Sequence, residues 1–181
     1  MKYLIDTHTH TIASGHAYNT IKEMAQSASE KGLELLGITE HAMKMPGTCH
    51  SFYFANLKML ERKMFGVEML FGVELNILNQ DGEVDMEENL LKKMDIVIAS
   101  MHIPCFKSGT KEENTQTYLK VMENPYVNII GHPDDGRFPV DYEQLVLGAK
   151  KHHVLLEVNN NSLDPRCTRE NGECKGHALL L

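Results

Sequence analysis

Short apolar runs alternate with helix-forming segments along nearly the whole chain. The six runs cover residues 3–6, 33–39, 68–75, 95–101, 127–132 and 154–161. Apolar runs of this length, separated by helices, are typical of βα units that build a parallel sheet, and their lack of a polar face indicates helices on both sides. The sequence therefore predicts one α/β domain with six such units and a barrel-like sheet.

Helix boundaries support this alternation. Thr20 and Glu23 have the spacing of a capping box, and Gly32 is suited to end the helix that they begin. Four further helices are predicted at residues 52–66, 85–94, 112–123 and 141–153. The first has apolar residues at helical spacing up to Met64, and Asp85 and Glu88 are expected to cap the second.

Composition and charge exclude several classes of protein. The net charge is −7, with 18 basic residues and no basic block, which argues against nucleic acid as the main partner. No apolar run reaches the roughly 20 residues of a membrane span, and the first run breaks at Asp6, so neither a membrane segment nor a signal peptide is expected. The four cysteines form no CxxC pair and are expected to be reduced thiols of a cytoplasmic protein.

Every predicted strand ends in residues that can bind a metal or donate and accept protons. These residues are Asp6, His8 and His10; Glu40 and His41; Glu74; His102; His132; and Glu157, Asn159 and Asn160. The carboxyl ends of parallel strands meet at one face of the sheet, so we expect these side chains to converge. Imidazole and carboxylate together suit zinc, iron or manganese, and the sequence therefore predicts a metal site.

The spacing of the first histidines adds detail. Residues two apart on a strand point the same way, so His8 and His10 are expected to form a rigid ligand pair. His16 follows in the next loop, where it can reach a neighbouring ion. His50, His152 and His153 lie away from the strand ends and are expected to face solvent.

Five segments together resemble one family. They read DTHTHTIASGHAY, GITEHAMKMPG, FGVELNI, IVIASMH and GHPDD, and they are similar to motifs of the PHP (polymerase and histidinol phosphatase) family, above all to its small bacterial phosphatases of the YcdX type. The resemblance covers residues 1–163. It implies a distorted (βα)7 TIM-like barrel with a trinuclear metal centre, usually zinc, with manganese or iron as alternatives.

The resemblance also implies a role for each ligand. His8, His10 and Glu74 would hold one ion, and Glu74 would bridge to a second ion bound by His102 and His132. A third ion would be held by His16 and His41.

The implied activity is hydrolysis of a small phosphate monoester by a metal-bound hydroxide. Asp134 and Arg137 are candidates for contacts with the substrate, and Asp6 and Glu40 for hydrogen-bond partners of the ligand histidines. Histidinol phosphate, nucleotides and sugar phosphates all fit as substrates.

The chain departs from the family after residue 163. The family's seventh strand ends in an Asp-x-His pair, which residues 164–181 do not contain. We therefore expect a seventh strand that is missing or incomplete, an atypical tail and an incomplete third metal site. The tail, a second subunit in a homo-oligomer, or nothing at all could fill the gap.

Two alternatives to a phosphatase remain open. A metal-dependent amidohydrolase also begins with an HxH pair, but it would leave His16 and His41 unexplained. A non-catalytic metal-binding fragment would retain the ligands without turnover.

Overall fold

The chain divides into two compact units in a computed structural model that describes residues 4–159 and 177–180. The first unit contains residues 4–76 and 85–98, and the second contains residues 77–84, 99–159 and 177–180. Among these described residues, no helix combines the length and the apolar character that crossing a lipid bilayer requires.

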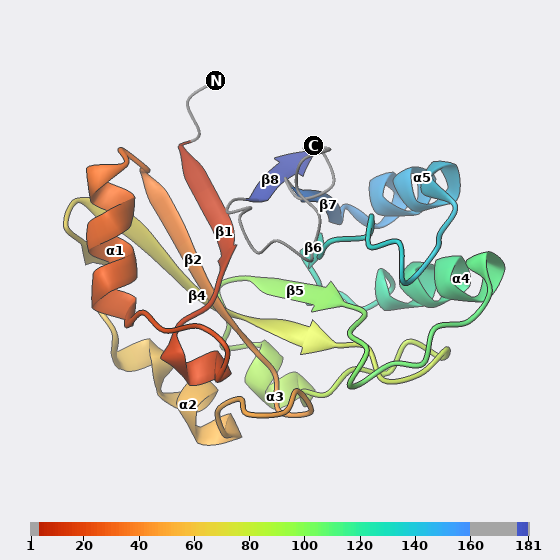
Figure 1. The fold of residues 1–181 in the computed structure, drawn as a ribbon, viewed down its shortest axis with the longest axis horizontal. Coiled ribbons are helices and arrows are strands. Elements are labelled where there is room, and N and C mark those ends of the chain that lie inside the picture. Colours follow the sequence, from red (N-terminus) through yellow and green to blue (C-terminus); the bar gives the residue numbers. More distant parts are fainter. Residues whose placement is uncertain (1–3, 160–176, 181) are drawn as a thin grey trace. The chain divides into compact units, whose positions relative to one another are not determined.

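The first unit is a parallel sheet with a helix packed against it (Figure 1). Strand β2 lies between β1 and β4 and pairs in parallel with both, while the short β3 pairs antiparallel with β4. Helix α1 packs against β2 and β4. The elements are β1 (Ile5–Thr9), η1 (Ile12–Ser14), α1 (Ile21–Glu30), β2 (Leu35–His41), α2 (Ser51–Asn56), η2 (Leu57–Met59), β3 (Lys63–Met64), β4 (Val67–Asn76) and α3 (Glu88–Leu91).

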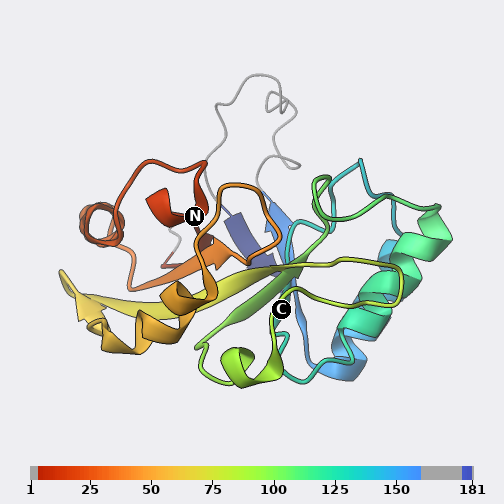
Figure 2. The same cartoon turned by 90° about the horizontal axis from the view of Figure 1, so that it is seen from below.

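The second unit places two helices beside a second set of strands. Helix α4 packs on α5, and α5 packs on β7, as the two views of the chain show (Figures 1 and 2). Strand β6 pairs in parallel with β7. The elements are α4 (Lys111–Val121), β6 (Ile129–Ile130), α5 (Tyr142–His152), β7 (Leu155–Asn159) and β8 (His177–Leu180), and β5 (Val97–Ser100) has two residues in each unit.

The α/β class and the order of strands and helices are confirmed, and the end of the chain adds a detail. Strand β8 pairs antiparallel with β7, with Glu157 opposite Leu179. The place beside β7 is therefore taken by a strand that runs opposite to the family's expected seventh strand. Cys49 and Cys105 are half-buried, Cys167 and Cys174 lie outside the described residues, and the expectation of reduced thiols stays a prediction.

The capping prediction for the first helix is confirmed. The Glu23 amide donates to the Thr20 hydroxyl over 3.3 Å, and the Thr20 amide donates to the Glu23 carboxylate over 2.7 Å. Helix α4 begins with a second capping box, between Thr110 and Glu113.

Two predicted helices are wrong in extent. The helix expected over residues 52–66 ends at Met59, and Lys63–Met64 forms a strand, because Phe65 and Gly66 adopt positive φ angles of 51° and 85° in a tight turn. The helix expected over residues 85–94 is limited to Glu88–Leu91. Asp85 does not cap it, since its carboxylate accepts the main-chain and side-chain N–H groups of Asn76 over 2.8 and 2.7 Å.

Gly72 lets β4 lie close to the main chain at Ile96. A Cβ atom at this position would lie 1.9 Å from the carbonyl oxygen of Ile96, a separation that no packed structure tolerates. We expect Gly72→Ala to lower the free energy of unfolding by about 1–3 kcal/mol, because the strands must separate to admit the methyl group. Urea denaturation measures this change. Gly136→Ala is the matched control, since nothing lies within 4 Å of its Cβ position, and equal midpoints for the two variants would contradict the close packing.

Candidate metal centre

Five of the predicted ligands lie together in the first unit. His8 is on β1, His41 ends β2, and Glu74 is on β4, where His41 and Glu74 are direct partners in the parallel register. His10 follows β1, and His16 follows η1. We call these five residues the Glu74 cluster. Register alone explains part of the convergence, because paired residues on neighbouring strands present their side chains to the same face.

Imidazole nitrogens surround the carboxylate of Glu74, which is fully buried. His8 Nε2 lies 3.2 Å from Oε1, His10 Nε2 lies 3.3 Å from Oε2, and His41 Nδ1 lies 2.7 Å from Oε2. Two ligand atoms bound to one zinc ion at about 2.0–2.1 Å are themselves roughly 3.3 Å apart in tetrahedral geometry. The distances of His8 and His10 from the carboxylate therefore fit a shared ion, whereas His41 lies closer to Glu74 than two ligands of one ion do.

The rings of the cluster pack closely. The His10 ring stacks on that of His41 at 4.4 Å, and the His16 ring lies 4.8 Å from that of His41. Within the described residues of the first unit, ligand atoms lie within 4.8 Å of one another in two groups, one of His10, His16 and His41 and one of His8, His10 and Glu74. His10 belongs to both groups and offers one ligand atom, so its loss would weaken either donor set.

His10 is a neutral imidazole near neutral pH. Burial lowers its pKa from 6.5 to about 3, although the adjacent Glu74 carboxylate acts in the opposite direction. A histidine binds a metal through a ring nitrogen that carries no proton. Because burial keeps the His10 ring neutral, one of its nitrogens can bind an ion.

Glu40 and Asp6 lie beside the cluster in different ways. The Asp6 carboxylate accepts the main-chain N–H of His8 over 3.3 Å. Glu40 is fully buried, and its Oε2 is 3.9 Å from His10 Nδ1, with the hydroxyl of Ser14 in contact with both groups. Glu40 thus reaches the candidate ligand His10 through Ser14.

Sequence reasoning missed Thr11, Ser14 and Tyr53. All three donate hydrogen bonds to the Glu40 carboxylate. The only signal in the sequence is that Thr11 and Ser14 follow His10 closely, and hydroxyl residues are common in any loop. The tertiary structure, and not the local sequence, brings these three residues to the Glu40 carboxylate.

The second unit holds the other two predicted ligands. His102 is buried, and its ring lies 5.3 Å from that of His132. His132 has a φ of 29°, which is unusual for a residue with a side chain and indicates local strain. Its main-chain N–H donates to the buried carboxylate of Glu157 over 2.6 Å, and this bond helps to hold the conformation.

The two candidate substrate residues lie in the segment after His132. The Arg137 guanidinium is paired with the buried carboxylate of Asp135, with Nη2 2.7 Å and Nε 3.0 Å from Oδ2. Asp134 Oδ1 is buried and has no hydrogen-bond partner among the residues that the structure describes.

The histidines expected to lie apart from the site are at helix ends. His50 caps α2 by accepting the amide of Phe52, and His152 and His153 lie at the end of α5. His50 and His153 are exposed, and His152 is half-buried.

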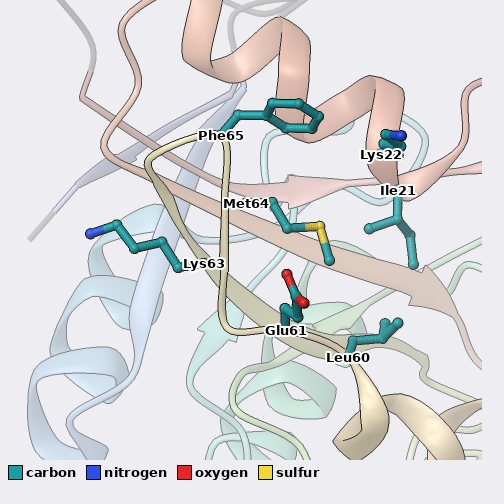
Figure 3. Close-up of a pocket in the computed structure, with 7 residues that line it drawn as sticks. All are labelled: Ile21, Lys22, Leu60, Glu61, Lys63, Met64 and Phe65. Carbon is teal, nitrogen blue, oxygen red and sulfur yellow. The ribbon is translucent and has the colours of Figure 1, made fainter.

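A separate pocket of about 470 Å³ lies in the first unit (Figure 3). It is lined by Ile21 and Lys22 at the start of α1 and by five residues of a later segment, Leu60, Glu61, Lys63, Met64 and Phe65. None of the predicted site residues lines it.

The geometry of the cluster predicts that His10→Ala reduces zinc binding more than removal of an exposed histidine does. His10 contributes to both ligand groups, so we expect this variant to lose at least one zinc ion per chain. Elemental analysis after equilibrium dialysis measures the loss. His153→Asn is the control, because asparagine tolerates the positive φ of 58° at that exposed position. Equal zinc content in both variants would show that the cluster is not the metal site.

Curated relatives match the chain over most of its length. A probable phosphatase of Clostridium novyi (strain NT) is 50% identical over 188 residues, covering 100% of this chain and 77% of the relative. A probable phosphatase of Thermoanaerobacter sp. (strain X514) is 51% identical over 163 residues, covering 90% of this chain and 66% of the relative. These relatives confirm the predicted phosphatase class.

A solved structure has the same fold. It is the histidinol phosphate phosphatase of Lactococcus lactis subsp. lactis Il1403, complexed with zinc, L-histidinol and phosphate. It is 17% identical, with a TM-score of 0.58, and covers 90% of this chain and 76% of its own. The family model of the PHP domain matches residues 6–162. The chain therefore belongs to the PHP domain family.

Proposed function

We propose that the chain hydrolyses a phosphate monoester with the help of bound divalent metal, with zinc as the first choice and up to three ions per chain. The observation that carries this proposal is the convergence of imidazole nitrogens on the buried Glu74 carboxylate. Residues 1–163 would form the catalytic domain, and residues 164–181 a tail outside it. A cytoplasmic location and a homo-oligomer stay as predictions.

The donor set suits zinc because it combines neutral imidazoles with a carboxylate. His8, His10, His16, His41 and Glu74 would hold metal in the first unit, and His102 and His132 offer two further imidazole ligands in the second. When bound, the metal ions supply Lewis acidity and lower the pKa of water enough to make hydroxide available at neutral pH.

A pocket of the second unit offers a place for an anionic substrate. It has a volume of about 580 Å³, and its lining includes Lys107, Ser108 and Arg137. The segment that forms its wall begins directly after His102 and folds back on it, since the amides of Cys105 and Phe106 donate to the His102 carbonyl over 2.9 and 2.8 Å. Two cations and a hydroxyl at one pocket are suited to phosphate oxygens.

Arg137 is oriented for such a contact. Asp135 accepts hydrogen bonds from Nε and from one Nη2 proton, so three of the five guanidinium N–H groups are not committed to this carboxylate. The bidentate pair holds the plane of the guanidinium, and the remaining donors would bind two phosphate oxygens. Asp135 acts here by positioning Arg137.

Asp134 would contact the alcohol part of the substrate. Its buried Oδ1 can accept a hydrogen bond from a substrate hydroxyl or ammonium group. The relative from Lactococcus lactis was crystallised with L-histidinol and phosphate, which supports a small polar alcohol as the leaving group.

Hydrolysis of a generic aryl phosphate tests the proposed activity. We expect turnover by the zinc-loaded protein, its loss after treatment with a chelator and its return on addition of zinc, manganese or iron. Activity that ignores chelators would contradict a metal-dependent mechanism. Cleavage of amide substrates in place of phosphate esters would favour the amidohydrolase, and zinc binding without turnover would favour the non-catalytic binder.

Substitution of Arg137 tests the proposed phosphate contact. We expect Arg137→Ala to raise KM about tenfold, equivalent to about 1.4 kcal/mol, with a smaller change in kcat. Steady-state kinetics on the aryl phosphate measures both constants. Arg62→Ala is the matched control, because Arg62 forms an ion pair with Asp95 in the first unit and does not line the pocket. An unchanged KM for Arg137→Ala would place the phosphate elsewhere.

A further inference from the structure

The hydroxyl of Ser14 makes three contacts in a fully buried position beside the Glu74 cluster. Its Oγ lies 2.5 Å from Glu40 Oε2, 3.1 Å from the main-chain nitrogen of His41 and 3.0 Å from His10 Nδ1. A hydroxyl has one proton to donate and two lone pairs to accept with. These three contacts use all of that capacity, so the direction of each bond can be worked out.

The contact with His41 has only one direction. A main-chain N–H can only donate, so one lone pair of Ser14 accepts it. The single Ser14 proton then goes either to Glu40 or to His10, and the environment of Glu40 decides which.

The side chain of Glu40 is an acceptor. The Thr11 N–H lies 3.1 Å from each of its oxygens, and the Thr11 hydroxyl and the Tyr53 hydroxyl also donate to Oε1. Burial raises the pKa of the Tyr53 phenol, and the charge of Glu40 adds to this effect, so Tyr53 keeps its proton. The oxygens of Glu40 thus accept hydrogen bonds from Thr11 and Tyr53. The short contact with Ser14 is therefore a bond from the hydroxyl to Glu40.

This assignment leaves one lone pair of Ser14 facing His10 Nδ1, so when a cation takes the Nε2 lone pair beside Glu74, the single ring proton lies on Nδ1. We propose that Ser14, oriented by Glu40, is a positioning residue that holds His10 in the Nδ1–H tautomer. The lone pair of His10 is thereby placed on Nε2, which points at the Glu74 carboxylate 3.3 Å away. Two lone pairs directed at one point are what a pair of ligands presents to a cation.

The inference rests on the proposed metal role of His10, but the tautomer can be observed without substrate or turnover. In the zinc-loaded protein with 15N-labelled histidine, long-range 1H–15N correlation spectra distinguish a protonated Nδ1 from a protonated Nε2. Loss of the signal in His10→Gln assigns it. We expect Nδ1 to carry the proton in the unaltered chain, and a protonated Nε2 would overturn the proposal.

Glu40→Gln is the most informative variant, because it keeps the size of the side chain and reverses the direction of its hydrogen bond with Ser14. Thr11 requires an oxygen acceptor, so the new amide nitrogen faces Ser14 and donates to it. Ser14 then has both lone pairs occupied and turns its own proton toward His10 Nδ1. We expect the His10 proton to move to Nε2 and zinc affinity to fall about 10- to 100-fold.

Ser14→Ala gives an independent variant. It removes the acceptor of the Nδ1 proton, so we expect a mixture of tautomers and weaker zinc binding. Ser29→Ala is the matched control, since the Ser29 hydroxyl donates to the Phe65 carbonyl away from the cluster, and it should change neither signal nor affinity. An unchanged tautomer and affinity in both Glu40→Gln and Ser14→Ala would overturn the proposal. If His10 carries its proton on Nδ1 but the protein has no phosphatase activity, this inference stands and the proposed function is wrong.

Discussion

The candidate site of the first unit depends on a carboxylate that is buried among imidazoles. Removing a charged group from water costs several kcal/mol unless other charges or hydrogen bonds compensate for it. Glu74 is fully buried, and the groups around it include nitrogens of His8, His10 and His41. A divalent cation bound by the same side chains would supply the missing positive charge. The parallel strands β1, β2 and β4 bring the donors together, and the fold of this unit thus positions the side chains of the ion site that we propose.

The surroundings of the cluster fix its orientation through the backbone and through hydroxyl groups. Asp6 binds the amide of His8, and Ser14 binds the amide of His41 as well as the ring of His10. In the second unit, Glu157 binds the amide of His132, where the backbone is strained. Acidic and hydroxyl side chains therefore support the candidate ligands by holding the main chain that carries them, which side-chain patterns alone do not reveal.

The rule that residues at the carboxyl ends of parallel strands converge predicted much of the candidate site from the sequence. It identified His41 and Glu74 on different strands, and the parallel register places them side by side. It could not predict Ser14, because a serine in a loop has no pattern that reports its three partners. It also could not predict that Asp85 binds Asn76, since a cap and a long-range contact use the same side chain. The apolar spacing before Met64 fitted a helix, but a turn at Phe65 and Gly66 overrides it.

X-ray absorption at the zinc edge of the zinc-loaded protein tests the central claim most directly, because it reports the atoms bound to the metal. We predict nitrogen and oxygen neighbours at about 2.0–2.1 Å, with the multiple-scattering features of imidazole. In His10→Ala the imidazole contribution should decrease. A sulfur shell at about 2.3 Å would instead place the zinc on cysteine thiolates and contradict a metal centre built on Glu74 and its histidines.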